Sequence, residues 1–257
     1  MSTTTEKSTK LKGGEFIIKE SQWQDVYIPE QITEEQTMLR QAAKDFITKE
    51  IDPRLEELDN NPMLGIEILN KAGELGLLGL HIPEEYGGSG QDLTTFSYVT
   101  EVLGWGHGMS VGIGAHTGIG TCPILYYGND AQRAKYLPKL ATGELKAAYA
   151  LTEPWSGSDA LGAKTKAVLS EDGKHYILNG QKMWITNGGF AEVFTVFAKI
   201  DNDEKLSAFI VEKSFGGIEL GKEEKKMGIK ASSTVQVFFN NCKVPKENLL
   251  GERGKGF

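Results

Sequence analysis

The sequence has few of the residues that build disulfide or metal frameworks. It has two cysteines, Cys122 and Cys242, which lie far apart and form no Cys-x-x-Cys pair. This argues against a disulfide framework and a zinc-cysteine site, and it fits a reducing compartment. The four histidines form no His-Glu-x-x-His or similar ligand spacing. The sequence therefore predicts no metal site.

Long apolar runs and an excess of positive charge are also missing. No apolar stretch approaches the roughly 20 residues of a transmembrane helix, and residues 1–12, rich in Ser, Thr and Lys, lack the apolar core of a secretory signal. We expect no transmembrane segment, a disordered N-terminal tail, and a cytoplasmic location or, in a eukaryote, the mitochondrial matrix. With 28 Lys and Arg against 35 Asp and Glu, the net charge is −7. This balance argues against nucleic acid as a partner, because phosphate contacts need clustered basic side chains.

Helical patterns dominate the first part of the chain. Residues 33–36 (TEEQ) form a predicted capping box, and the apolar positions that follow recur at helical spacing. A second amphipathic run covers 65–77, Asp92 is a predicted N-cap, and a short helix is expected over 130–140. Residues 104–120 are rich in Gly and Ala but lack the Gly-x-Gly-x-x-Gly order of a dinucleotide-binding loop. We interpret them as a loop and a closely packed small-residue helix.

Strand patterns begin after Lys146. Six segments are rich in β-branched and aromatic residues and are separated by turn signals: 147–152, 164–169, 174–184, 193–200, 206–212 and 234–244. The pair Asn179-Gly180 suits a hairpin turn. Helices first and strands second predict an α+β fold, in which an N-terminal all-α domain is followed by a β-barrel or sandwich domain. The expected boundaries are a tail and lead-in at 1–31, the helical domain at 32–145, the β-domain at 146–250, and the start of a connection to a further domain at 251–257.

The first segment with the composition of a binding site is the turn at 152–159 (TEPWSGSD). It follows a strand and is expected to gather the hydroxyls of Thr152, Ser156 and Ser158. Such a turn can hold an oxygen-rich ligand. Alternatively, the hydroxyls satisfy the backbone of their own loop.

The second segment is 178–189 (LNGQKMWITNGG), which begins in a predicted strand and ends in a turn signal. Trp184 and Thr186 are two residues apart, so strand geometry puts both on one face. An indole beside a hydroxyl suits a flat heteroaromatic ligand, which packs on the indole and bonds to the hydroxyl. The alternative is a core tryptophan beside a surface threonine.

Together these segments resemble the paired signature of the acyl-CoA dehydrogenase family. That signature is Thr-Glu-Pro-x-x-Gly-Ser-Asp, here at 152–159, followed by Asn-Gly-x-Lys-x-Trp-Ile-Thr-Asn-Gly, here at 179–188. The segment 82–88 (IPEEYGG) is similar to a loop of the family's first domain, and 244–248 (VPKEN) to its end-of-sheet segment. The segment 225–232 (KKMGIKAS) is similar to the very-long-chain branch. The resemblance extends over nearly the whole chain.

The resemblance implies FAD as the cofactor. It implies cofactor contacts from Tyr149, Leu151, Thr152, Ser158, Trp184, Ile185 and Thr186. Thr152 would bond the polar edge of the flavin, Trp184 would pack on the ring away from the substrate, and Thr186 would bond near N5, which receives the hydride. Ser158 would contact the FAD pyrophosphate or the acyl-CoA substrate.

The implied reaction is the α,β-dehydrogenation of a fatty acyl-CoA to the trans-2-enoyl-CoA in fatty acid β-oxidation, with an electron-transfer flavoprotein as acceptor. In the family, a glutamate of a C-terminal helical domain removes the C2 proton. This chain ends before that domain, so we assign no catalytic residue, and Glu153 belongs to the flavin loop. We expect a fragment that is inactive and binds FAD weakly by itself, and a homo-oligomer at full length.

Three points stay open in the sequence. The small residues at 110–118, beside which the family's acyl tail runs, indicate either room for a long acyl chain or close helix packing. An acyl-CoA oxidase that uses O2 is an alternative to the dehydrogenase. A truncated, non-catalytic flavin- or protein-binding module is another.

Overall fold

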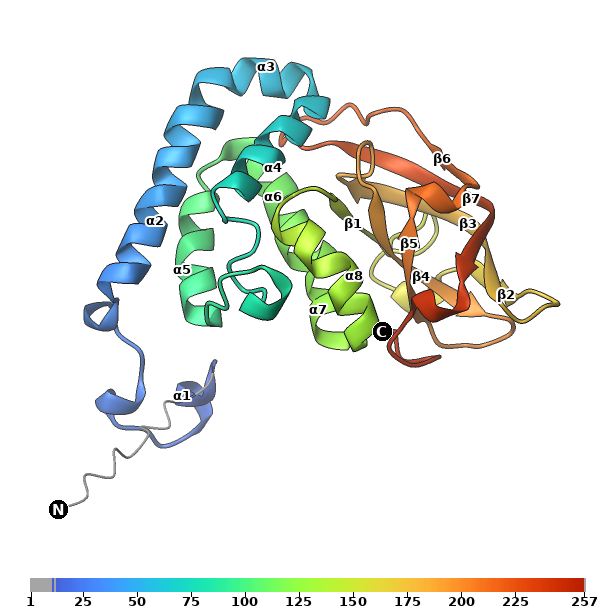
Figure 1. Ribbon diagram of the computed structural model, residues 1–257, viewed down its shortest axis with the longest axis horizontal. Helices are drawn as coiled ribbons and strands as arrows, with labels where there is room; N and C mark the ends of the chain where they lie inside the picture. The colour runs from blue at the N-terminus through green and yellow to red at the C-terminus, as the bar shows by residue number, and fades with distance from the viewer. Residues whose placement is uncertain (1–10, 12, 257) are drawn as a thin grey trace.

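Helical elements precede strands along the chain in the computed structural model, which describes residue 11 and residues 13–256 (Figure 1). The predicted N-terminal tail lies almost entirely outside the described residues, as does Phe257. The last helix ends at Ala141 and the first strand begins at Ala147, so the predicted α+β class is confirmed. Among the described helices, none is both long enough and apolar enough to cross a membrane.

The helical part has one long helix on its outer side and shorter helices beneath it (Figure 1). Its helices are α1 (Glu15–Ile18), α2 (Glu34–Phe46), α3 (Leu55–Asn60), α4 (Gly65–Glu74), α5 (Leu93–Leu103), α6 (His107–Gly114), α7 (Cys122–Tyr127) and α8 (Asp130–Ala141). π-Helical turns continue α2 over Ile47–Ile51 and α6 over Ala115–Gly120. The short helices α3 and α7 were not predicted, because six residues are too few for a periodic pattern.

The predicted helix starts are confirmed by their hydrogen bonds. The Thr33 hydroxyl accepts from Gln36 N at 3.1 Å, and Gln36 Oε1 accepts from Thr33 N at 3.0 Å, which is a complete capping box. Asp92 Oδ1 accepts from Thr95 N at 2.7 Å at the start of α5. The apolar faces of α2, α4, α5 and α6 then meet in one core, which buries Phe46, Leu69 and residues of the other two helices.

The β-part is a single eight-stranded sheet that divides into two halves. Its strands are β1 (Ala147–Ala150), β2 (Lys166–Leu169), β3 (His175–Thr186), β4 (Val193–Ile200), β5 (Ser207–Glu212), β6 (Ile218–Leu220), β7 (Thr234–Pro245) and β8 (Leu249–Leu250). The order is β6-β7-β3-β2-β4-β5-β8, with β1 beside β4. Both β1 and β2 pair in parallel with β4, β1 along 193–196 and β2 along 199–200. Residues from both halves share one apolar core, as the predicted barrel or sandwich requires.

The predicted hairpin turn at Asn179-Gly180 is wrong. Both residues lie inside β3, whose pairing with β7 shifts register between Leu178 and Gly180. A β-carbon on Gly180 would lie 2.4 Å from Thr165 Oγ1. Glycine is therefore required here by the close approach of a neighbouring segment at a bulge, and a turn is not involved.

A further apolar cluster joins the two parts of the molecule. Ile124 and Leu137, from α7 and α8, pack with Phe197 and Ile210 of the sheet. The imidazole of His116 adds polar links, because its Nδ1 accepts from Ala147 N at 3.0 Å and its Nε2 bonds to the carbonyl of Leu140 at 2.9 Å. The first strand is thereby held firmly against the helices.

Candidate functional site

The two predicted binding segments lie side by side. The turn after β1 runs along β3, where Met183 N donates to the carbonyl of Thr152 at 2.8 Å. Lys182 Nζ donates to the preceding carbonyl, that of Leu151, at 3.1 Å. Thr152 and Trp184, 32 positions apart in the chain, are therefore brought together at one edge of the β-part.

The indole of Trp184 is presented to solvent. Trp184 is 55% exposed, Thr186 is half-buried, and Ile185 between them is 2% exposed. The exposure of Trp184 shows that the alternative of a core tryptophan is wrong, while a shared face of Trp184 and Thr186 stays a prediction, because β3 is irregular at this point. The side chain of Ile185 packs in the sheet core, so only its main chain can face a ligand on this side.

The backbone at Trp184 has an unusual conformation. Its φ angle is +60°, in the left-handed region that bulky residues rarely adopt. The pairing of β3 with β7 also shifts register between Lys182 and Ile185. Strained residues of this kind cluster at binding and catalytic sites, where the surrounding structure holds them in place. The register shift and the positive φ both mark β3 as irregular at Trp184.

Two hydroxyls beside the indole are free to bind a ligand. Within the described part of the chain, neither the Thr152 nor the Thr186 side chain makes a hydrogen bond, and neither is fully buried. Ser156 differs: it is buried, and its hydroxyl donates to the carbonyl of Asp159 at 2.7 Å. Its hydroxyl satisfies the loop itself, while Ser158 is exposed and remains available. The predicted cluster of three hydroxyls is therefore corrected by the removal of Ser156.

A buried ion pair lies beneath this surface. Lys182 Nζ is 2.8 Å from Glu153 Oε1, and both side chains are 0% exposed. Glu153 also accepts hydrogen bonds from Trp155 Nε1, from Lys164 N and from Thr165 N. Burial by itself raises the pKa of the Glu153 carboxyl, but the Lys182 charge and these hydrogen bonds bring that pKa below its ordinary value.

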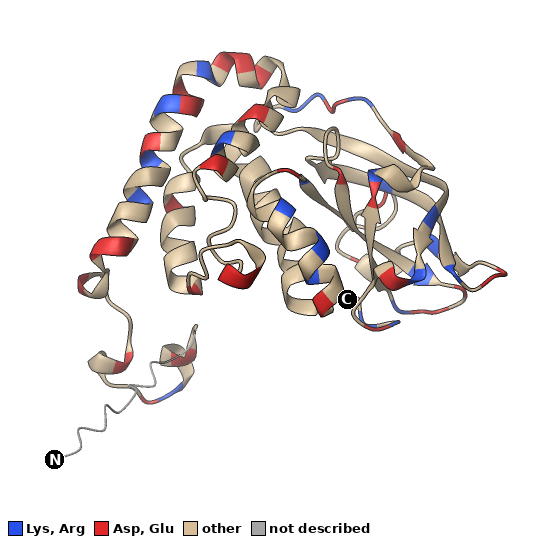
Figure 2. Ribbon diagram, in the orientation of Figure 1, with Lys and Arg blue, Asp and Glu red and all other residues tan. Residues whose placement is uncertain are grey.

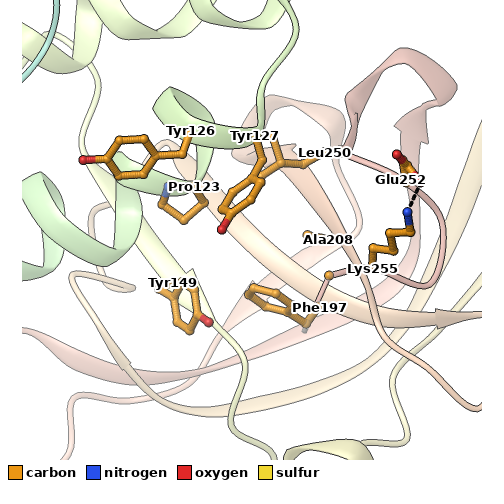
Figure 3. Close-up of a pocket in the computed structure, with 11 residues that line it drawn as sticks. Pro123, Tyr126, Tyr127, Tyr149, Phe197, Ala208, Leu250, Glu252 and Lys255 are labelled. Atoms are coloured by element: carbon orange, nitrogen blue, oxygen red, sulfur yellow. Dashed lines mark ion pairs between the residues drawn. The ribbon is translucent and has the colours of Figure 1, made fainter. Parts of the chain in front are cut away.

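Tyr149 and Leu151 lie in surroundings that differ from those of Trp184. Tyr149 lines a cavity of about 620 Å³ between α7, the sheet and the C-terminal segment, and its ring centroid is 4.9 Å from that of Phe197 (Figure 3). Tyr126 and Tyr127 form the opposite wall, and burial raises the pKa of Tyr149. Leu151 packs against the apolar cluster between the helices and the sheet. Of the predicted flavin contacts, only Tyr149 lines this aromatic cavity.

Two polar residues of the second motif had no predicted role but organise the site. Lys182 anchors the turn, as described above. Asn187 is buried, and its Nδ2 donates to the carbonyls of Gly112 at 2.8 Å and Ala147 at 3.3 Å, so it ties β3 to α6 and β1. The presence of a lysine in a strand otherwise rich in apolar residues could have indicated this role of Lys182. Among the described residues, no cluster of three or more His, Cys, Asp or Glu is suited to a metal ion.

Comparison with known proteins defines the class. The family model described as acyl-CoA dehydrogenase, N-terminal domain, matches residues 33–144, and that of the middle domain matches residues 148–242. The chain therefore belongs to the acyl-CoA dehydrogenase family, as the motifs predicted.

Relatives within that family match most of this chain. A probable acyl-CoA dehydrogenase of Bacillus subtilis is 52% identical over 246 residues, which cover 95% of this chain and 41% of that protein. The human mitochondrial very long-chain specific acyl-CoA dehydrogenase is 46% identical over 241 residues, covering 89% and 37%. A crystal structure of an acyl-CoA dehydrogenase from Bacillus anthracis in complex with FAD superposes with a TM-score of 0.92 at 52% identity, covering 96% of this chain and 42% of that one. The chain thus spans about two fifths of the length of these relatives.

Proposed function

We propose that this chain forms the N-terminal and middle domains of an FAD-dependent dehydrogenase that converts a fatty acyl-CoA to the trans-2-enoyl-CoA in β-oxidation. The observation that carries the proposal is the exposed, strained indole of Trp184 beside the free hydroxyls of Thr152 and Thr186. The FAD bound by the Bacillus anthracis relative supports the choice of cofactor.

Each residue of the site has a binding role in this proposal. The indole of Trp184 covers one face of the planar ring system and keeps water from it. The hydroxyls of Thr152 and Thr186 donate to the polar ring edge, and the exposed hydroxyl of Ser158 reaches the pyrophosphate or the acyl-CoA. Bound FAD supplies the hydride acceptor, while the protein orients it.

Glu153 is unsuited to be the base that removes the C2 proton. Its carboxylate is buried, paired with Lys182 and occupied by three further hydrogen bonds. A group with a lowered pKa in such surroundings binds a proton poorly. We propose that the base comes from the region of the longer relatives that this chain does not match, so that the chain alone binds but does not turn over acyl-CoA.

Two kinds of glycine line α6 and its π-helical extension, and each supports one of the two interpretations of the small residues. A β-carbon on Gly108 would lie 3.0 Å from Ala231, and one on Gly112 would lie 3.2 Å from Asn187 Oδ1. These two glycines serve close packing. A β-carbon on Gly114 or Gly118 would meet nothing within 4 Å. Open space there supports the proposal that a long acyl tail passes this side of the helix.

The surface around the open glycines is apolar. Val111 and Ile119 are exposed, and neither α6 nor α7 carries an Asp, Glu, Lys or Arg (Figure 2). In the full-length enzyme, Gly118→Leu should shift the preference from long to shorter acyl-CoA, with kcat/KM for the longest chains reduced roughly 10-fold because the leucine occupies the tail's path. Met38→Ala, which removes an exposed side chain of α2, is the control that leaves the preference unchanged. An unaltered chain-length profile in Gly118→Leu contradicts the proposed path.

The direct test of the function uses the purified chain and its full-length form. A yellow chain with a flavin absorbance spectrum supports the cofactor site, and a colourless chain that FAD cannot reconstitute leaves truncation or a non-catalytic module. In the full-length form, reduction of an electron-transfer flavoprotein by a fatty acyl-CoA supports the dehydrogenase. Oxygen consumption at the same rate in its place assigns an acyl-CoA oxidase. Sedimentation of the full-length form tests the proposed homo-oligomer.

A further inference from the structure

The buried Glu153–Lys182 pair lies directly beside the residues proposed to hold the cofactor. Glu153 follows Thr152 in the turn, and Lys182 precedes Trp184 by two positions in β3. Both side chains of this ion pair are 0% exposed. Removing two charges from water costs free energy, which offsets much of their mutual attraction. A purely structural contact at this place is more readily made with apolar side chains, so the pair calls for another role.

The pair connects three separate segments of the chain. The carboxylate of Glu153 accepts from Lys164 N at 2.6 Å and from Thr165 N at 3.0 Å, at the entrance to β2. It also accepts from Trp155 Nε1 at 2.7 Å in its own turn. The ammonium of Lys182 belongs to β3, so the turn, β2 and β3 meet in one hydrogen-bonded centre.

The same centre compensates for a break in the sheet. The pairing of β3 with β7 shifts between Lys182 and Ile185, so the regular ladder does not fix Trp184. Instead, Lys182 Nζ donates a hydrogen bond to the carbonyl of Leu151 at 3.1 Å, and Met183 N donates to the carbonyl of Thr152 at 2.8 Å. The position of the indole relative to the turn is thus set by contacts to the turn itself.

We infer that Glu153 and Lys182 are positioning residues, which hold the Thr152 hydroxyl and the Trp184 indole at the spacing that a flavin ring requires. The inference rests on the proposed function, since it assigns a role to residues behind that site. Neither residue faces the ligand. Their effect on binding passes through the turn and the strand end that they join.

The test separates positioning from stability with three variants and a control. The variants Lys182→Met, Glu153→Gln and the double variant are made in the 257-residue chain. Tyr136→Phe is the control, because the Tyr136 hydroxyl bonds to Glu212 and Asn248 in a buried network that touches neither binding segment. FAD dissociation constants and thermal unfolding are measured for each protein.

We expect the Lys182→Met variant to bind FAD roughly 10-fold to 100-fold more weakly, a loss typical of removed supporting residues. The double variant should regain most of the thermal stability, because no unpaired charge stays buried, yet retain the weak binding. Tyr136→Phe should lower thermal stability without changing FAD affinity by more than about 2-fold. If affinity recovers with stability in the double variant, the pair is merely structural and the inference is overturned.

A second measurement keeps the inference testable if the wild-type chain does not bind FAD, an outcome that removes the proposed function alone. Amide hydrogen exchange of the protein without ligand should then show selective loss of protection in Lys182→Met at Lys164, Thr165 and Met183. Unchanged protection at these amides overturns the positioning role regardless of any flavin.

Discussion

The Trp184 surface and the aromatic cavity include residues only three positions apart, Thr152 and Tyr149, but they are built on opposite principles. The first, formed by Thr152, Trp184 and Thr186, has an exposed ring, free hydroxyls and a buried ion pair beneath it. The cavity has walls of Tyr127, Phe197 and other apolar groups, and its ion pair, Glu252–Lys255, is exposed at the rim (Figure 3).

The two surfaces differ in their ability to recognise a flat polar ligand. Directional recognition needs donors held in place by a rigid support, and only the Trp184 surface combines these features. The aromatic cavity offers contact area with little direction, which suits an apolar group of variable shape. Substitutions in the two surfaces are therefore expected to differ in their effects on stability and on FAD binding.

The largest effect is expected from removing the charge that supports the Trp184 surface. Lys182→Met leaves the Glu153 carboxylate buried without a cation, which should lower the free energy of unfolding by about 3–5 kcal/mol. Chemical denaturation measures this loss. Lys166→Met, which removes an exposed lysine of β2, is the control and should change stability by less than about 0.5 kcal/mol. Equal losses in the two variants contradict a special role for the pair.

The next effect concerns His116, whose imidazole links the helices to β1. Ala147 N donates to its Nδ1, so Nε2 carries the hydrogen and donates to Leu140 O. Full burial lowers the pKa of His116 from 6.5 to about 4. Between these values the unfolded chain binds the proton and the folded chain does not, so stability falls as the pH drops from 6.5 towards 4. The shift corresponds to about 3 kcal/mol.

His116→Gln is the variant that tests this pH dependence. Urea unfolding at neutral pH and at about pH 4.5 should show a smaller acid loss in the variant than in the wild type, because glutamine does not titrate. The variant should also be less stable at neutral pH, since it cannot reproduce both bonds of the imidazole. An identical acid loss in both proteins contradicts the assignment of His116 as a buried neutral group.

A smaller effect, on binding alone, is expected from the indole. Trp184→Ala should weaken FAD binding roughly 10-fold, because stacking on one aromatic ring contributes about 1–3 kcal/mol, with little change in unfolding. Trp105→Ala removes a tryptophan of similar exposure in the helical part and is the matched control. Flavin fluorescence titration measures both. Equal affinities of the two variants exclude the indole as the ring's platform.

The smallest effect is expected in the cavity. Tyr127→Ala should leave the FAD dissociation constant within about 2-fold of the wild-type value, since Tyr127 is 70% exposed and lines only the aromatic cavity. The same titration applies. A loss as large as that of Trp184→Ala places the flavin in the cavity and reverses the comparison.

The sequence predicted the order of the fold because local signals suffice for it. The capping box at Thr33, the cap at Asp92 and the strand patterns after Lys146 each act within a few residues. The turn expected at Asn179-Gly180 was wrong for a reason that local rules do not contain. Glycine is required at position 180 because Thr165, in another segment, approaches it closely.

For the candidate site too, only the local features could be predicted from the sequence. The sequence left open whether Trp184 is a binding residue or a core tryptophan, and its exposure excludes the core position. The positive φ of Trp184 and the burial of Ser156 depend on how the turn folds against β3. The pairing of Glu153 with Lys182 joins residues 29 positions apart and follows no spacing rule. Such contacts emerge only when the chain is folded.

The measurement that tests the central claim most directly is a crystal structure of this chain with FAD bound. The account predicts an isoalloxazine ring packed on the Trp184 indole, with its polar edge within hydrogen-bond distance of the Thr152 and Thr186 hydroxyls. A ring seated against Tyr127 and Phe197, or one that leaves the indole in solvent, would contradict it.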